Sequence, residues 1–313
     1  MIAVDMDGTL IGAGGTVSER SLEAIRAAQR AGIEVVVATG RRHSYAMKLL
    51  RGLGFRAEGV LVSSNGTVTR RIGSELIERN HMTQATAEWM IALVGEFRNA
   101  LVVTFDTVNE DGEDRRGALV VEELEELHGS IGKWMVANEP YIAHLRPIER
   151  ALEMGEPIQM MLCGTLERMR RAEARLLSDA RVQGVGAPDR MGVKIALNRT
   201  EYPERDLSIL DILPAGCSKG RALLRLAERW GTGAEEMMAI GDNWNDLSML
   251  EVAGRPVLMG NAPEELKTMA EAMGWEITGR NDEDGVAMAI EGMLAERNGP
   301  EAVPLEEVGA AVP

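Results

Sequence analysis

The segment IAVDMDGTL, residues 2–10, decides the fold, because a short apolar run ends there in two acidic residues and a glycine. Ile2-Ala3-Val4 predicts a short buried strand. Asp5 and Asp7 follow it directly, and at a spacing of two residues their side chains point to the same side of an extended backbone. We therefore expect both carboxylates to share one site at the end of this strand.

The residues that follow alternate between helix and strand patterns. From Ser18 to Ala31 the apolar residues recur near a period of 3.6, with Ser18 as a cap and Gly32 as a stop. The β-branched run 33–38 predicts a strand buried on both faces, and 60–62 predicts a third strand. This β-α-β-α-β order implies a parallel sheet with right-handed crossovers.

The same alternation returns near the end of the chain, whereas the middle differs. Residues 206–295 carry strand patterns at 237–240 and 256–258, between helix patterns that begin near 218, 247 and 263. The middle has one helix pattern near 166–180 and strand candidates at 101–105, 133–137, 158–162 and 192–197. We therefore predict an α/β core domain from residues 1–80 and 206–295, an inserted α+β cap domain at 81–205, and a flexible tail at 296–313.

Composition excludes several classes of protein. The chain has 313 residues, of which 45 % are apolar, and its 34 Lys and Arg against 49 Asp and Glu give a net charge of −15. Such acidity argues against a nucleic-acid partner. The two cysteines and four histidines are too few and too scattered for a disulfide framework or a zinc site. No apolar run reaches the ~18 residues of a membrane span and no export signal is evident, so we expect a cytoplasmic monomer or homodimer with no membrane partner.

Polar clusters follow three of the predicted strands. Asp5 and Asp7 follow the first, Thr39-Gly40-Arg41 follows the second, and Gly241-Asp242-Asn243-Trp244-Asn245-Asp246 follows the strand at 237–240. In open α/β sheets ligands bind at the carboxyl ends of the strands, so these clusters are expected to meet at one edge of the sheet.

The residue types at that edge suit phosphate chemistry. Asp5, Asp7 and Asp242 offer hard oxygen ligands, which suit Mg²⁺ completed by water and a substrate phosphate. Two crowded carboxylates can divide the roles of nucleophile and general acid/base. Lys219 lies in the first turn of a helix, where the macrodipole disfavours a cation, and an anion at that place explains it. The hydroxyl of Thr39 suits phosphate oxygens, as does the backbone N–H of Gly40.

Four motifs in this order resemble those of the haloacid dehalogenase (HAD) superfamily. They are DMDGTL at 5–10, ATGR at 38–41, SKG at 218–220 and GDNWND at 241–246, and their spacing resembles that of the Cof-type (IIB) phosphatases, whose cap lies between the second and third motifs. The resemblance implies a Rossmannoid core and a phosphoaspartyl mechanism. Asp5 would attack phosphorus, and Asp7 would protonate the leaving oxygen and then activate water.

The resemblance also implies the ligands. Mg²⁺ would be held by Asp5, the backbone carbonyl of Asp7 and Asp242, with Asn243 near the metal, and Asp246 would orient Lys219 or its own turn. The groups implied to hold the phosphoryl oxygens or substrate are the Met6 backbone, Thr39, Gly40, Arg41, Lys219 and Asn245. The implied substrate is a small phosphorylated metabolite such as a sugar phosphate, because a cap would close over the pocket.

Several alternatives remain open from the sequence. A phosphotransferase or phosphomutase would use the same core motifs, and a non-catalytic ligand-binding protein could share the fold. A response-regulator receiver domain also uses Asp, Thr and Lys, but its phosphoacceptor lies mid-domain, whereas here the acid is residue 5. Arg41, with its neighbours Arg42 and His43, fits a solvated loop as well as a substrate contact.

Overall fold

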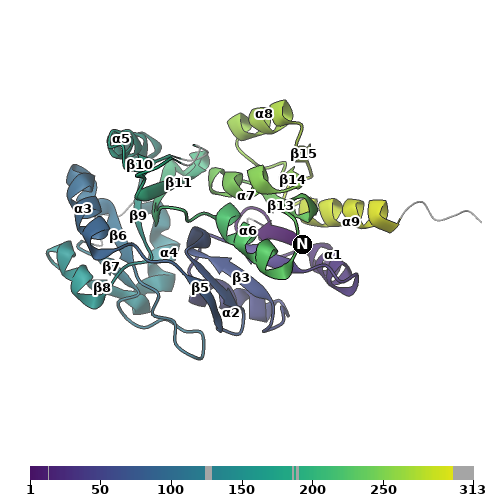
Figure 1. The fold of residues 1–313 in the computed structure, drawn as a ribbon, viewed down its shortest axis with the longest axis horizontal. Helices are drawn as coiled ribbons and strands as arrows, with labels where there is room; N and C mark the ends of the chain where they lie inside the picture. Colours follow the sequence, from purple (N-terminus) through teal and green to yellow (C-terminus); the bar gives the residue numbers. More distant parts are fainter. Residues whose placement is uncertain (13, 124–128, 185–186, 188–189, 299–313) are drawn as a thin grey trace, which may run out of the picture.

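Two β-sheets, each with its own helices, make up the protein. The computed structural model describes residues 1–298 apart from 13, 124–128, 185–186 and 188–189. The first sheet is built from both ends of the chain and the second from its middle, and the two lie side by side in Figure 1. The predicted class, an α/β core with a parallel sheet and an inserted α+β unit, is confirmed.

The first sheet has the order β15-β14-β13-β1-β2-β3-β4-β5. All neighbours from β15 to β3 pair in parallel, and β4 and β5 extend the sheet as antiparallel strands. The strands are β1 (Ile2–Asp5), β2 (Val35–Ala38), β3 (Val60–Ser63), β4 (Val68–Arg71), β5 (Leu76–Arg79), β13 (Met238–Gly241), β14 (Arg255–Leu258) and β15 (Glu276–Ile277). The central strand β1 therefore joins β2 to β13 from the far end of the chain.

Helices cover both faces of this sheet because its strands are apolar on both sides. Ala3 packs toward α6, α7 and α8, whereas Ile2 and Val4 pack toward α1 and α9, and Val37 packs against α2. Ser18 caps α1 as predicted, since its hydroxyl accepts from the backbone N–H of Ser21. The helices are α1 (Glu19–Arg30), α2 (His43–Gly52), α6 (Lys219–Trp230), α7 (Leu247–Val252), α8 (Glu264–Met273) and α9 (Gly285–Asn298).

The second sheet has the order β10-β11-β12-β9-β6-β7-β8. One face is covered by α3 (Gln84–Val94) and α5 (Leu166–Leu177), and α4 (Gly132–Asn138) packs on the other. The strands are β6 (Leu101–Thr104), β7 (Leu119–Val121), β8 (Ile142–His144), β9 (Gln159–Gly164), β10 (Val182–Gln183), β11 (Ile195–Tyr202) and β12 (Leu207–Pro214).

Three sequence predictions differ from the structure. The strand predicted at 133–137 is wrong, because these residues lie in helix α4. The boundary predicted at residue 206 separates β11 from β12, yet the two pair along their whole length and both belong to the second sheet, which therefore extends to Pro214. Helix α9 continues to Asn298, inside the segment predicted as a tail, and residues 299–313 of that segment lie outside the described residues.

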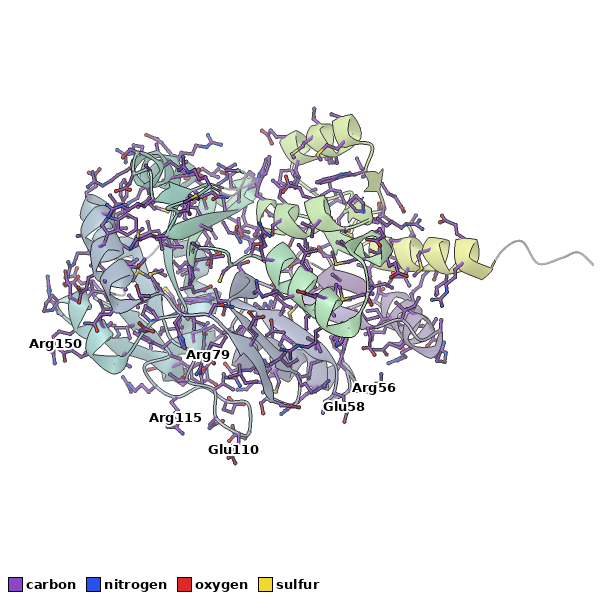
Figure 2. All side chains as sticks on the ribbon, viewed as in Figure 1. Arg56, Glu58, Arg79, Glu110, Arg115 and Arg150 are labelled. Atoms are coloured by element: carbon purple, nitrogen blue, oxygen red, sulfur yellow. The ribbon has the colours of Figure 1, made fainter. Side chains whose placement is uncertain are left out.

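The outer surface carries charged side chains, as the composition indicates. Arg56, Glu58, Glu110 and Arg150 are exposed and project from the periphery in Figure 2. Within the part of the chain that the structure describes, no helix is long and apolar enough to span a membrane.

Candidate active site

Polar residues from five strand ends of the first sheet gather at one edge. Asp5 ends β1, Thr39 follows β2, Asn65 follows β3, Asp242 follows β13 and Asn261 follows β14. The parallel pairing places these carboxyl ends side by side, and Asp5 and Asp242 come together across 237 positions of sequence, as expected.

Lys219 joins two carboxylates at this edge. Its Nζ donates to Asp5 Oδ1 at 2.5 Å and to Asp246 Oδ1 at 2.6 Å, and its side chain is fully buried. Burial alone would lower the pKa of Lys219, but the two carboxylates outweigh it and raise the pKa above its ordinary value. The cation at the start of α6 is therefore explained by anions, as predicted, and these anions belong to the protein.

Asp246 fixes the turn that carries Asp242. Its Oδ2 accepts from the backbone N–H groups of Asp242 at 2.9 Å and Asn243 at 3.1 Å, while Oδ1 accepts from Lys219. Asp246 thus orients both Lys219 and the turn, which were the two roles the sequence offered for it. Both of its oxygens are already engaged.

Asp242 is packed against the DMDGT segment. Thr9 Oγ1 donates to Asp242 Oδ1 at 2.8 Å, and Asn261 Nδ2 approaches Oδ2 at 3.5 Å. Gly8 has φ +87°, and a Cβ there would lie 2.3 Å from Asp242 Oδ2, so only glycine fits this turn. Burial, followed by repulsion from Asp5 and Asp246, raises the pKa of Asp242.

The acidic cluster fits a divalent cation. Carboxylate oxygens of Asp5, Asp242 and Asp246 lie within 4.8 Å of one another. Three buried carboxylates against the single ammonium of Lys219 leave an excess of two negative charges, which a divalent ion would balance. Asp246 accepts three hydrogen bonds, more than Asp5 or Asp242, so we expect Asp5 and Asp242 to be the side chains that hold the ion.

Asn243 uses its side-chain amide to bind main-chain groups, and its predicted place near the metal or its waters stays a prediction. Its Oδ1 accepts from the backbone N–H of Trp244 at 2.9 Å and of Glu201 at 3.3 Å, and its Nδ2 donates to the carbonyl of Glu201 at 3.1 Å. Glu201 belongs to β11, so Asn243 ties the first sheet to the second. The amide is therefore used for positioning the two sheets.

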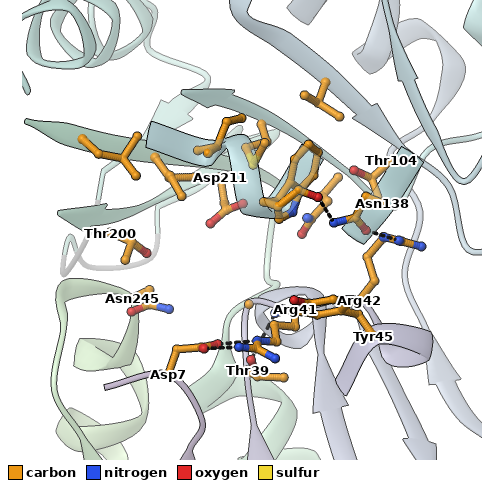
Figure 3. Close-up of a pocket in the computed structure, with 18 of the residues that line it drawn as sticks. Asp7, Thr39, Arg41, Arg42, Tyr45, Thr104, Asn138, Thr200, Asp211 and Asn245 are labelled. Carbon is orange, nitrogen blue, oxygen red and sulfur yellow. Dashed lines mark hydrogen bonds and ion pairs between the residues drawn. The ribbon is translucent and has the colours of Figure 1, made fainter. Parts of the chain in front are cut away.

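Asp7 is paired with Arg41 at the cavity wall. The guanidinium donates from Nε to Asp7 Oδ2 at 2.6 Å and from a second nitrogen to Oδ1, and it stacks 4.7 Å from the ring centroid of Tyr45. Figure 3 shows this pair beside Thr39, at the edge formed by the first sheet. Because Arg41 donates to both oxygens of Asp7, a ligand that contacts this carboxylate has to share it with the guanidinium or displace it.

An amide network lies next to Thr39 and Gly40. Thr39 Oγ1 accepts from the backbone N–H of Arg41 at 3.1 Å, and a Cβ on Gly40 would lie 3.2 Å from the amide of Asn65. Asn65 accepts from Asn245 Nδ2 at 3.4 Å and donates to Asp211 Oδ2 at 2.8 Å. The Asn65 side chain thus connects the GDNWND turn with β12 of the second sheet.

A cavity of about 290 Å³ separates the two sheets at this edge. Its floor is formed by Asp5, Asp7, Thr39, Gly40, Arg41, Asn243 and Asn245, and the opposite wall by side chains of β6, β9, β12 and α4. Figure 3 shows Thr104, Asn138 and Asp211 across the cavity from Asp7. Lys219 and Asp242 lie below the floor. Met6 is buried and is not among the residues that line the cavity, so a contact between its main chain and a ligand stays a prediction.

Arg42 links the two sheets at the rim of the cavity. Its guanidinium pairs with Asp114, and it also donates to Asn138 Oδ1. The side chains of Arg42 and Asp114 are 8 % and 2 % exposed. Of the two interpretations that the sequence left open for Arg42, the solvated loop is wrong, because the side chain lies in a buried ion pair, and a substrate contact stays a prediction.

Some residues of the site were missed because their partners come from distant segments. Thr9, Asn65 and Asn261 contact the predicted residues, and Asp211 contacts Asn65, but none of the four was a predicted site residue. The first three had a usable signal, since each lies within a few residues of the carboxyl end of a strand. Asp211 had none, because it lies inside a strand of the second sheet.

Comparison with known proteins identifies the family. The family model of haloacid dehalogenase-like hydrolases matches residues 2–290. The chain belongs to this family, and the prediction that it is a HAD-superfamily hydrolase of the Cof-type phosphatase class is confirmed.

Several relatives are described as phosphatases. The 5-amino-6-(5-phospho-D-ribitylamino)uracil phosphatase YwtE of Bacillus subtilis is 30 % identical over 308 residues, which cover 94 % of this chain and 98 % of that protein. Phosphatase YwpJ of the same organism is also 30 % identical and is covered to 99 %. The HMP-PP phosphatase of an Enterobacter strain is 26 % identical over 85 % of this chain and 86 % of its own.

Solved structures share the fold over nearly the whole chain. A haloacid dehalogenase-like hydrolase from Bacteroides thetaiotaomicron has a TM-score of 0.68 at 28 % identity, covering 93 % of this chain and 98 % of its own. A haloacid dehalogenase-like hydrolase from B. subtilis has a TM-score of 0.71 at 26 % identity, with the same coverage.

Proposed function

We propose that the protein is a Mg²⁺-dependent phosphatase that hydrolyses small phosphorylated metabolites, sugar or polyol phosphates among them, through a phosphoaspartyl intermediate. The observation that carries the proposal is the buried cluster of Asp5, Asp242, Asp246 and Lys219 beneath a cavity floor that also presents Asp7. The phosphatase names of the relatives support hydrolysis over transfer to a second metabolite.

Asp5 is the proposed nucleophile. One of its carboxylate oxygens forms a bond to phosphorus while the bond between phosphorus and the leaving oxygen breaks. Lys219 holds the other side of the carboxylate at 2.5 Å, so the nucleophile is aligned before the substrate arrives. A direct contact between Lys219 and phosphoryl oxygens stays a prediction, because the ammonium lies below the floor.

Asp7 is the proposed general acid and base. It gives its proton to the leaving oxygen, and as a carboxylate it then takes a proton from the water that attacks phosphorus and breaks the bond to Asp5. When the Arg41 guanidinium leaves Asp7, its nitrogens become available for phosphoryl oxygens.

The remaining floor groups hold the transferring phosphoryl group. The hydroxyl of Thr39, the backbone N–H groups of Met6 and Gly40, and the amide of Asn245 are the proposed donors. Mg²⁺, held by Asp5 and Asp242 together with the backbone carbonyl of Asp7, would neutralise charge on the phosphoryl oxygens. The cytoplasmic location and the monomeric or dimeric state stay predictions from the sequence.

The test measures phosphate release from a panel of phosphorylated metabolites, with and without Mg²⁺, for the wild type and Asp5→Asn. We expect Mg²⁺-dependent release that falls by at least about 10³-fold in Asp5→Asn, because the nucleophile is lost. Asp106→Asn, a buried carboxylate outside the cavity floor, tests whether loss of any buried acid has this effect. An unchanged rate in Asp5→Asn contradicts the covalent mechanism. Absence of release from every phosphate ester contradicts the phosphatase.

A further inference from the structure

Trp244, inside the GDNWND turn, has no part in the chemistry proposed above. It lies two residues after Asp242, and its side chain packs against the apolar cluster of the first sheet that includes Leu247 and Leu250. The guanidinium of Arg199, which belongs to β11 of the second sheet, lies over the Trp244 ring at 5.3 Å from its centroid. The indole of Trp244 therefore contacts both sheets.

Two carboxylates hold Arg199 in this position. Its Nη1 donates to Oε2 of Glu173 in α5 at 2.9 Å, and its Nε lies 3.7 Å from Oε1 of Glu201. The side chains of Arg199, Glu173 and Glu201 are 24 %, 13 % and 11 % exposed. A guanidinium with its ends engaged loses little further freedom when it stacks on a ring, and the attraction to the ring grows as water is excluded. Arg199 thus presents a fixed surface to Trp244.

The contact lies outside the substrate cavity. Thr200 lines the cavity, and its neighbours along the strand, Arg199 and Glu201, point to the opposite face of β11. Neither Trp244 nor Arg199 is among the described residues that line the cavity. Any effect of this pair on the reaction must therefore act through other residues.

Asn243 makes a second link at the same place. Its amide pairs with both the N–H and the carbonyl of Glu201, so two consecutive residues after Asp242 are bound to β11. The short helix Trp244–Asp246 packs against this strand as a whole. The second sheet therefore holds the turn immediately after Asp242.

Asp242 depends on this turn for its position. Its carboxylate accepts from Thr9, and its backbone N–H donates to Asp246 inside the turn. A metal site binds its ion more tightly when the ligands are held in place beforehand, and loss of a group that directly orients a ligand typically weakens binding by about 10–100-fold. Trp244 and Arg199 act one step further away, so a smaller effect is expected.

We propose that Trp244 and Arg199 are positioning residues for the divalent-cation site, through which the second sheet sets the affinity of that site. The inference rests on the proposed function, because that function places Mg²⁺ between Asp5 and Asp242. Neither residue contacts the ion or the substrate. Because coupling between two sites is reciprocal, binding of the ion also stabilises the contact between the turn and β11.

The test measures the Kd of Mg²⁺ by calorimetry on the full-length protein, without substrate. Trp244→Leu and Arg199→Met should each raise this Kd by about 3–10-fold. The double variant should bind Mg²⁺ about as weakly as the weaker single variant, because both changes remove the same contact. Trp244→Phe and Arg199→Lys, which keep an aromatic face and a cation, should regain part of the affinity.

Trp89→Leu is the matched control. Trp89, in α3, has the guanidinium of Arg181 over its ring at 4.1 Å, so this variant loses the same kind of contact within the second lobe of the protein. Its Kd for Mg²⁺ should equal that of the wild type.

Urea unfolding and turnover distinguish positioning from a merely structural role. A structural role alone would lower the unfolding midpoint of Trp244→Leu and leave the Kd of Mg²⁺ unchanged. Positioning predicts that a higher Mg²⁺ concentration restores kcat of Trp244→Leu to within about twofold of the wild type, since the reacting groups are intact.

The outcomes separate failure of the positioning role from failure of the phosphatase. If the wild type and both single variants bind Mg²⁺ equally tightly, the positioning role is overturned and the proposed function stands. So it is if the effects of the two substitutions are fully additive, because the residues then act separately. If the variants bind Mg²⁺ more weakly but no phosphate ester is hydrolysed by the wild type, the phosphatase is contradicted and the positioning role is supported. A wild type that does not bind Mg²⁺ overturns both.

Discussion

The floor and the opposite wall of the same cavity are built in different ways. The floor gathers charged groups from separate loops at strand ends, and a cation accompanies two of its carboxylates, Lys219 for Asp5 and Arg41 for Asp7. The opposite wall is built from the second sheet and α4, and its carboxylate, Asp211, has an amide for a partner. The difference teaches that carboxylates of one cavity can be held in two ways, so changes in the floor should affect the turnover of every substrate, whereas a change at Asp211 should appear in the stability.

The largest effect is expected for Lys219→Met. Loss of the ammonium leaves Asp5 and Asp246 buried without a cation, which costs about 3–5 kcal/mol of stability by analogy with broken buried ion pairs. Turnover of every phosphate ester should fall by at least about 10³-fold. Urea unfolding and kcat for two unrelated substrates measure the two effects.

A control variant and a double variant test the Lys219 prediction further. Lys194 is exposed and directly precedes β11 of the second sheet. Lys194→Met should therefore change neither the stability nor kcat. The double variant Lys219→Met with Asp5→Asn should regain part of the lost stability, since one unpaired charge is removed. A Lys219→Met protein of wild-type stability and activity would show that the floor does not depend on this pairing.

An intermediate effect is expected for Arg41→Met, at the boundary of the floor. Its guanidinium holds both oxygens of Asp7 and is proposed to move to the phosphoryl group, so kcat/KM should fall by about 10–100-fold. The loss should be equal for two unrelated phosphate esters. Arg56→Met, at an exposed arginine, is the control. A loss that differs between the two esters would assign Arg41 to the leaving group rather than to the phosphoryl group.

The smallest effect is expected for Asp211→Asn, and it appears in the pH dependence of stability. Burial raises the pKa of Asp211 to about 7, from 3.8 for an exposed aspartate. The folded state therefore binds more protons than the unfolded state between these values, and Asp211 reduces wild-type stability as the pH rises through this window. The substitution removes this loss, so the variant should gain about 1–3 kcal/mol relative to the wild type between pH 4 and 8.

Urea unfolding midpoints of both proteins at pH 4, 5, 6, 7 and 8 measure the Asp211 prediction. The difference between the two curves isolates Asp211 from Asp5 and Asp242, which titrate in both proteins. Parallel curves would mean that Asp211 is ionised throughout and has a charge partner comparable to those of the floor.

The residues of the floor could be predicted from the sequence because each of them lies at the carboxyl end of a predicted strand. Asp5, Thr39 and Asp242 each follow a run of apolar β-branched or small residues, and strand ends of a parallel sheet meet. Asn243 lies in the same turn as Asp242, but its amide pairs with the main chain of Glu201. That partner lies in another sheet, so no local pattern reveals it.

The second sheet was harder to predict, for two physical reasons. Trp134, Met135 and Val136 form a short apolar run that fits a strand as well as a helix, and only the surrounding packing selects helix α4. Asp211 interrupts the apolar run 207–214, so the sequence pattern does not predict a strand there. In the structure these residues form β12, which pairs antiparallel with β11 on one side and with β9 on the other. The cavity wall that this sheet forms has no sequence signature, because its residues look like ordinary buried strand positions.

The position of β1 between β2 and β13 has a consequence for how the protein is made. During synthesis Asp5 emerges early, with one neighbour of its strand in place and the other edge bare. Lys219 and Asp242 leave the ribosome only after the entire second sheet, so the proposed nucleophile Asp5 lacks these partners for most of translation. A chain released before Asp242 would carry the acidic motif of residues 5–10 without the carboxylate that we propose shares its metal ion.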